Sequence, residues 1–282
     1  MLRAAVVQTN ATSDVARNFE RTSALIRQAA SEGATFIQTP EVTNMIPATG
    51  DDLFRLIRDE ADDETFAGLR ALAAELSITL HIGSLALKSE DPARAANRGF
   101  VVRPQGDLTA RYDKIHMFEA DLGDKGKYRE AARYRPGEKA VLAKAAGVQI
   151  GMGICYDMRF PGLFRDLAQA GAQILTAPSA FTVPTGKAHW HTLLRARAIE
   201  NGCFMLAAAQ WGPHGGKDES AMRESYGHSL IVDPWGKVLA DAGEGEGIAV
   251  ADLDLAHVDS ARKRIGSLTQ GRAAPVEIQP AS

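Results

Sequence analysis

The chain has 282 residues, of which 45% are hydrophobic and 24% charged, and its formal net charge is -3 at pH 7. This composition is typical of a globular protein that can bury one large core, and we expect a single domain over residues 1–282. Because it has no long basic run, no signal-peptide pattern and no apolar run of roughly 18 residues, we expect a cytoplasmic protein with a small-molecule substrate and neither nucleic-acid nor membrane partners.

Predicted strands and helices alternate along the chain. Apolar residues recur every three to four positions in three segments, which predict helices over 13–34, 63–77 and 188–202. For the first helix we expect Ser13 or Asp14 as the N-cap and Gly33 as its end. Short apolar runs predict strands at residues 2–8, 34–40, 78–87, 98–104, 148–154, 173–181, 203–210, 229–241 and 247–255.

Two segments, 98–114 and 229–241, place a glycine-containing turn between strand-like halves and therefore predict hairpins. Hairpins among βαβ units make mixed sheets. Since helices cover only one face of each sheet, the other apolar face needs a partner, and we expect an α/β fold with two mixed sheets in a four-layer α-β-β-α sandwich. Polar segments at 118–139 and 212–225 predict long surface loops, and the tail from about residue 266 is expected to be irregular.

Three side chains with catalytic chemistry follow predicted strands directly. These are Glu41, Lys114 and Cys155, the last standing immediately before a predicted helix. A lone cysteine is more often a small buried apolar residue. However, the carboxyl ends of strands in an α/β sheet share a crevice where ligands bind, and a strand, a tight turn, a nucleophile and a helix describe a nucleophile elbow.

The blocks around these residues resemble the nitrilase, or carbon-nitrogen hydrolase, superfamily over nearly the whole chain. The blocks occur in that family's order: QTPEVTN, ARYDKIHMF, GMGICYDMRFPGLFR, then PSAFTVPTGKAHWHTLLRARAIENGCF and SYGHSLIVDPWG. The resemblance implies a cysteine-dependent hydrolase of linear amides with a Glu-Lys-Cys triad. It requires no metal and no cofactor.

The resemblance also implies a role for each residue. Cys155 would attack the amide carbon and form a thioester, and Glu41 would move the protons. Lys114 and the backbone N–H of Tyr156 would bind the oxyanion, and the lysine charge would favour the thiolate. A second glutamate, assigned to Glu130 by its position after the lysine, would orient Lys114 and the substrate.

Several alternatives stay open. Glu130 could instead be a solvated loop residue, with Glu138 or Glu119 in its place. Arg159 is a candidate for binding a substrate carboxylate, or it pairs with Asp157 or with a partner subunit. Phe181 and Thr185 are further substrate-binding candidates. The resemblance implies a homodimer or a higher homo-oligomer, although the tail only partly matches the family pattern.

The later blocks resemble the branch of the superfamily that acts on deaminated glutathione and on ω-amides. The first substrate would release α-ketoglutarate and cysteinylglycine, a metabolite-repair reaction. The alternatives are an ω-amidase acting on α-ketoglutaramate or α-ketosuccinamate, another nitrilase-family amidase or N-carbamoyl hydrolase, and a non-catalytic binding scaffold.

Four other positions have structural interpretations. Cys203 lies in an apolar run and is expected in the core. His189 and His191 do not share a helix face, and we expect no carboxylate or cysteine to complete a metal-ligand set. Arg197 and Glu200 are expected to form an ion pair along their helix. His116 would lie on the same strand face as Lys114 if that strand continued.

Overall fold

The structure, a computed structural model, describes residues 1–121, 127–215 and 223–278. Two six-stranded mixed sheets form its centre. The first sheet has the order β16-β1-β2-β3-β4-β5, with bounds Gly247–Leu253, Leu2–Gln8, Phe36–Gln38, Thr79–Lys88, Ala95–Val102 and Leu108–Asp113. The second has the order β15-β14-β11-β10-β9-β8, with bounds Val238–Asp241, Leu230–Val232, Phe204–Ala207, Ile174–Thr176, Val148–Met152 and Val141–Ala145.

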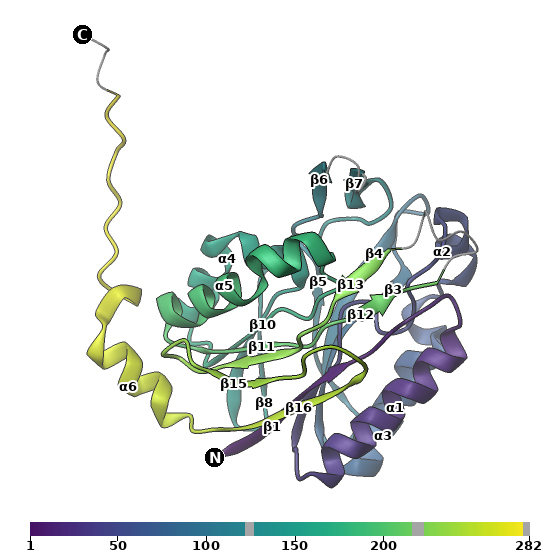
Figure 1. Cartoon of the computed structure of the whole chain (residues 1–282), viewed down its shortest axis with the longest axis horizontal. Coiled ribbons are helices and arrows are strands. Elements are labelled where there is room, and N and C mark those ends of the chain that lie inside the picture. Colours follow the sequence, from purple (N-terminus) through teal and green to yellow (C-terminus); the bar gives the residue numbers. More distant parts are fainter. Residues whose placement is uncertain (122–126, 216–222, 279–282) are drawn as a thin grey trace.

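Each sheet has helices on one face and the other sheet on its second face. Helices α1 (Val15–Ser31) and α3 (Glu64–Leu76) cover the first sheet, and α4 (Pro161–Gln169) and α5 (Val183–Asn201) cover the second (Figure 1). Successive side chains of β1 explain this layering, because they alternate between its faces. Ala5 and Val7 pack with α1 and α3, whereas Ala4 and Val6 join the core between the sheets. The predicted α-β-β-α sandwich is confirmed.

Both predicted hairpins are present, and they make both sheets mixed. Strands β4 and β5 pair antiparallel, as do β14 and β15. The strands at the middle of each sheet are parallel: β1 with β2 and β3, and β9 with β10 and β11. The carboxyl ends of β2 and β9 therefore carry Glu41 and Cys155 into the space between the two sheets.

Some boundaries differ from the sequence prediction. Asp14 is the N-cap of α1, since its side chain accepts the N–H of Arg17. Helix α5 begins at Val183, five residues earlier than predicted, because Pro184 is well suited to the first turn of a helix. The sequence patterns did not reveal β8, α2 (Gly50–Leu56) or α6 (Ala256–Arg264).

The two segments predicted as loops contain small sheets. Strands β6 (Glu119–Asp121) and β7 (Lys127–Arg129) pair within 118–139, and β12 (Trp211–Pro213) and β13 (Glu224–Tyr226) pair within 212–225. Strands of three residues are too short to show a periodic pattern. The parts of these loops at 122–126 and 216–222 lie outside the described residues.

After α6, a single 3-10 turn (Gly266–Leu268) is followed by chain with no helix or strand through residue 278, extending away from the body (Figure 1). The irregular tail predicted from about residue 266 is thus seen in its described part, and residues 279–282 lie outside it. Every helix in the described ranges is too short or too polar to cross a membrane.

Candidate active site

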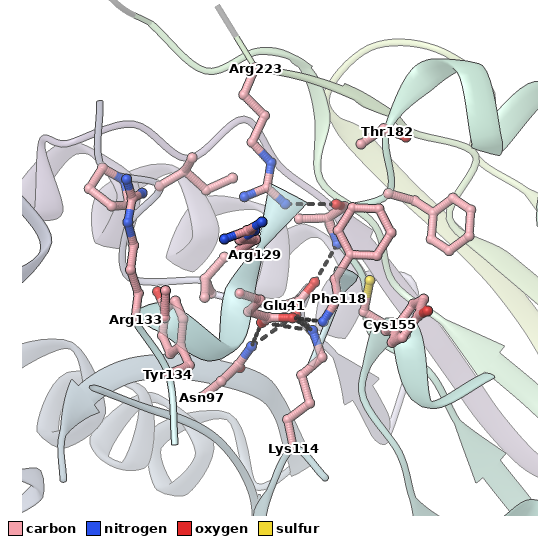
Figure 2. A pocket seen from close by; sticks show the side chains of 18 of the residues that line it. Glu41, Asn97, Lys114, Phe118, Arg129, Arg133, Tyr134, Cys155, Thr182 and Arg223 are labelled. Atoms are coloured by element: carbon pink, nitrogen blue, oxygen red, sulfur yellow. Dashed lines mark hydrogen bonds and ion pairs between the residues drawn. The ribbon is translucent and has the colours of Figure 1, made fainter. Parts of the chain in front are cut away.

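The three predicted catalytic residues meet in one cavity between the sheets. Glu41 follows β2 and Lys114 follows β5, so both come from the first sheet. Cys155 follows β9 of the second sheet and begins the 3-10 helix η4 (Cys155–Arg159). All three, with Glu130, line a cavity of about 370 Å³ (Figure 2).

The ammonium group of Lys114 lies between two carboxylates. Its Nζ atom donates to Glu41 Oε1 at 2.9 Å and to Glu130 Oε1 and Oε2 at 2.9 and 2.7 Å. Glu130 begins the 3-10 helix η3 (Glu130–Ala132), and its Oε2 also accepts the backbone N–H of Phe118 at 2.6 Å. The structure therefore places Glu130 beside Lys114, whereas Glu138 is exposed next to Arg135.

Asn97 of β4 joins both carboxylates, and sequence reasoning missed it. Its Nδ2 atom lies 2.9 Å from Glu41 Oε1 and 3.4 Å from Glu130 Oε1. The signal that could have revealed Asn97 is its place as an uncharged polar residue directly after two alanines of β4, because buried polar groups require partners. The second oxygen of Glu41 accepts the backbone N–H of Ala180 at 2.8 Å, so both of its oxygens have donors.

The Glu41 turn is held from several sides. Val42 has φ +48°, in the left-handed region that β-branched residues rarely occupy. The hydroxyl of Ser84 accepts the N–H of Val42 at 2.8 Å, and Gln210 donates to the carbonyl oxygen of Glu41 at 3.0 Å. These hydrogen bonds maintain a turn that would otherwise relax.

Gly83 of β3 allows the loops of the two sheets to approach each other. A Cβ atom at this position would lie 2.0 Å from the carbonyl oxygen of Thr39 and 2.5 Å from Cβ of Pro178. Thr39 belongs to the Glu41 turn, and the carbonyl of Pro178 accepts the N–H of Cys155 at 2.9 Å. The close approach of Glu41 to Cys155 therefore depends on the absence of a side chain here.

Charge and burial set the protonation of Glu41 and Lys114. Burial raises the pKa of Glu41, but the charge and the hydrogen bond of Lys114 outweigh it and hold that pKa below its ordinary value. Burial lowers the pKa of Lys114, and the charges of Glu130 and Glu41 outweigh it in turn, raising that pKa well above its ordinary value. Glu41 is therefore a carboxylate and Lys114 an ammonium at neutral pH.

Cys155 is a thiol at rest. Burial raises its pKa, the negative charge of Glu41 adds to that rise, and the charge of Lys114 opposes both. The charge of Lys114 thus favours the thiolate, as expected, but burial and the charge of Glu41 outweigh it. The backbone of Cys155 has φ +48°, a strained conformation for a non-glycine residue on a tight turn.

Asp157 holds the Cys155 turn in place through hydrogen bonds. Its Oδ2 atom accepts from Tyr112 Oη at 2.7 Å and from the N–H of Ile154 at 2.8 Å. Its Oδ1 atom accepts the N–H of His116 at 3.0 Å and lies 2.7 Å from that residue's Nδ1. Because β5 ends at residue 113, the condition under which His116 would share a strand face with Lys114 is not met. His116 supports η4 through Asp157 instead.

The substrate-binding candidates divide into two groups. Tyr156, Phe181 and Thr185 line the cavity. Arg159 is not among its lining residues in the described part of the chain. Its guanidinium lies over the ring of Phe181, 5.3 Å from the centroid, and 3.3 Å from Nδ1 of His189. Arg159 therefore packs against the lining residue Phe181 and does not itself line the cavity.

Two structural predictions are confirmed. Arg197 donates to Glu200 Oε1 at 2.8 Å and also to the carbonyl oxygen of Met158 at 2.8 Å, which ties α5 to η4. Cys203 is fully buried in the core. Neither residue lines the cavity.

His191 has a carboxylate beside it, in a cluster that does not include His189. Its Nε2 atom lies 2.9 Å from Asp241 Oδ2, and Nδ1 of His228 lies 3.1 Å from Asp241 Oδ1. The three side chains bring together ligand atoms that lie within 4.8 Å of one another. Sequence spacing concealed this cluster because its members come from α5, the start of β14 and the end of β15.

The lining also includes Arg129, Arg133, Tyr134 and Arg223, to which the sequence analysis gave no role. Arg129 and Arg133 flank Glu130 in the motif KYREAARYRPGE, which is the one signal that could have indicated them. Arg223 precedes β13 and donates to the carbonyl oxygen of Ala180 at 3.0 Å.

Comparison with known proteins agrees with this geometry. Deaminated glutathione amidase of Bos taurus is 39% identical over 266 residues, which are 93% of this chain and 79% of the relative. Omega-amidase NIT2 of Mus musculus is 36% identical over 271 residues, which are 96% of this chain and 95% of the relative. The crystal structure of the C. elegans NitFhit protein matches with a TM-score of 0.88 and 35% identity, covering 96% of this chain and 65% of that fusion protein.

The family description carbon-nitrogen hydrolase matches residues 3–263. This range includes both large sheets, the cavity and each motif block that suggested the nitrilase superfamily. The chain therefore belongs to the carbon-nitrogen hydrolase family and is an amidohydrolase that acts on carbon-nitrogen bonds.

Proposed function

We propose that the chain is a cysteine-dependent amidase whose substrate is deaminated glutathione, which it hydrolyses to α-ketoglutarate and cysteinylglycine. The observation that carries the catalytic part is the convergence of Cys155 with the buried network of Glu41, Lys114 and Glu130 in one cavity. A volume of about 370 Å³ is in the range that holds small organic ligands. The substrate part is supported by the similarity to deaminated glutathione amidases.

In the first step, Sγ of Cys155 attacks the amide carbon while Glu41 takes the thiol proton. The raised pKa of the thiol makes a nearby base necessary, and the lowered pKa of Glu41 keeps that base ionised. Negative charge moves to the carbonyl oxygen, where the ammonium of Lys114 and the N–H of Tyr156 stabilise it. The N–H of Tyr156 lies in the first turn of η4. The N–H groups of a helix's first turn have no acceptor within the helix, so this one is available to the oxyanion.

In the second step, protonated Glu41 gives its proton to the leaving nitrogen and the carbon-nitrogen bond breaks. The acyl group remains on Cys155 as a thioester, and the amine departs. Water then attacks the thioester while Glu41 accepts a proton from it. The thiolate of Cys155 leaves, recovers that proton from Glu41, and the carboxylic acid is released. Glu130 holds Lys114 throughout and contacts no reacting atom.

An ω-amidase activity on α-ketoglutaramate is the second candidate. The similarity to omega-amidase NIT2 over nearly the full length of both chains favours it. The chemistry would be the same, with ammonia as the leaving group. The two reactions differ in the size and charge of that group.

Release of α-ketoglutarate from each substrate tests the proposal, with Cys155→Ala as the blank. A higher kcat/KM for deaminated glutathione supports the repair reaction, since discrimination lies in that ratio. A higher value for α-ketoglutaramate supports the ω-amidase. Wild-type turnover by Cys155→Ala or Glu41→Ala would contradict the mechanism for either substrate.

We further propose that the chain acts in the cytoplasm as a homodimer formed through the face that carries α4, the helix after the nucleophile. The nitrilase resemblance supports this arrangement. Light scattering after size-exclusion chromatography measures the mass directly. An active species with the 30.2 kDa mass of one chain would contradict it.

A further inference from the structure

Three arginine side chains border the cavity from two separate segments. Arg129 ends β7, Arg133 follows η3, and Arg223 precedes β13. In Figure 2 the guanidinium groups of Arg129 and Arg223 lie above Glu41, and Arg133 lies on the opposite side of the cavity from Cys155. None of the mechanistic steps uses these arginines.

These guanidinium groups are not neutralised by the described protein. Arg98 shows the usual arrangement, since it pairs with Asp113 at 2.6 Å and with Glu60 at 3.0 Å. Across residues 1–121, 127–215 and 223–278, no carboxylate lies within ion-pair distance of Arg129, Arg133 or Arg223. Arg223 is instead held in place by its hydrogen bond to the carbonyl oxygen of Ala180.

The formal charges around the cavity therefore do not balance. Among the described residues, the lining carries four cationic side chains, Lys114 and the three arginines, and two carboxylates, those of Glu41 and Glu130. Because Cys155 is a neutral thiol at rest, the excess is two positive charges. A cleft whose lining carries an excess of one sign of charge attracts ligands of the opposite sign.

We propose that Arg129, Arg133 and Arg223 form a carboxylate-binding subsite that selects amides with two carboxylates. This inference rests on the proposed amidase function and assigns its substrate class. Guanidinium groups bind carboxylates through paired hydrogen bonds. An ω-amide such as α-ketoglutaramate has one carboxylate, whereas deaminated glutathione has a second at its glycine end.

The geometry assigns this subsite to the carboxylate of the leaving group. In deaminated glutathione the glycine carboxylate lies further along the chain from the scissile carbonyl carbon than the keto-acid carboxylate does. The side of the cavity opposite Cys155, where Arg133 lies, suits the more distant group (Figure 2). The arginines thus bind a part of the substrate that does not react.

The sharpest test compares two substrates that differ at one group: deaminated glutathione and its C-terminal glycinamide. We expect the wild type to favour the dianion in kcat/KM by about tenfold or more, as charge-assisted hydrogen bonds allow. Arg133→Gln and Arg223→Gln should reduce that preference several-fold, mainly through KM. Arg103→Gln, which removes an exposed arginine of the β4–β5 turn that pairs with Asp107, should leave it unchanged.

A binding measurement separates this inference from the proposed function. Calorimetry with Cys155→Ala measures Kd for both ligands without turnover, alone and combined with Arg133→Gln. If the dianion binds more tightly only when Arg133 is present, the subsite is supported. If the wild type then hydrolyses neither ligand, the amidase proposal fails although the subsite stands. Equal Kd values for the two ligands would overturn the subsite, whether or not the wild type hydrolyses both. Melting temperatures of all variants exclude loss of folding as the cause.

Discussion

The Nζ atom of Lys114 lies 2.9 Å from Oε1 of Glu41, and the side chains of both residues are at most 5% exposed. Burial alone would neutralise either group, but together they remain charged. The consequence is a buried carboxylate that stays ionised next to a thiol that stays protonated. This pair of states suits a mechanism that begins with proton transfer from sulfur to oxygen.

Lys114→Met should abolish amide hydrolysis and weaken the fold. The change removes the cation between Glu41 and Glu130 and leaves two buried carboxylates facing each other. Breaking a buried ion pair on one side destabilises by about 3–5 kcal/mol. Urea unfolding and kcat measure the two effects. Retention of wild-type kcat would contradict the role of Lys114, and Lys88→Met, which breaks an exposed pair with Asp59, is the control.

Asn97→Asp should shift the acid limb of the pH profile upward. A third carboxylate would replace the amide that now donates to Glu41 and Glu130. Like charge disfavours ionisation, so the pKa of Glu41 should rise by about one unit. The pH dependence of kcat/KM reports this value for the free enzyme. An unchanged acid limb would show that Glu41 is not the group that titrates there.

Alkylation of Cys155 by iodoacetamide should speed up with pH from 6 to 9 without reaching a plateau. The thiolate is the reactive form, and burial together with Glu41 raises the pKa of this thiol. Mass spectrometry of intact protein follows the reaction, and it should find one modified residue, because Cys203 is fully buried. A plateau reached by pH 7 would mean that the resting enzyme holds a thiolate.

Gly83→Ala should inactivate the enzyme even where the protein folds. The added Cβ would lie 2.0 Å from the carbonyl oxygen of Thr39, so the Glu41 turn must move away from Pro178 and Cys155. Steady-state kinetics should show a fall in kcat rather than in substrate affinity. Gly162→Ala is the matched control, since a Cβ there meets nothing within 4 Å. Full activity of Gly83→Ala would show that the two loops tolerate separation.

His214→Asn should make the fold less sensitive to acid. Burial, and then the charge of Arg223, lowers the pKa of His214 to about 4, from an ordinary 6.5. Because the folded-state pKa is lower, the unfolded chain takes up the proton first, and stability is lost as pH falls from about 6.5 toward 4. Over that range the unfolding free energy of both proteins is measured against pH. The slope for the wild type should exceed that for the variant by up to about 1.4 kcal/mol per pH unit. Parallel curves in urea titrations would contradict this.

The layers and the catalytic positions were predictable because they depend on local patterns. Alternation in β1 gives it two apolar faces, so a sheet-on-sheet core follows from residues such as Ala4 and Ala5 alone. Glu41, Lys114 and Cys155 follow strands in recognisable blocks. Short strands such as β6 and β12 carry no periodic signal and were missed.

The sequence by itself determined the fold class, the family and the three residues that meet in the cavity. Only the tertiary structure decided what surrounds them: Asn97 between two carboxylates, Gly83 at the contact of two loops, and arginines from two segments around one cavity. It also decided protonation, since the state of Cys155 depends on burial and on the charge of Glu41, which is 114 positions earlier in the chain. Motifs depend on neighbouring residues, whereas charge balance and burial depend on residues that folding brings together.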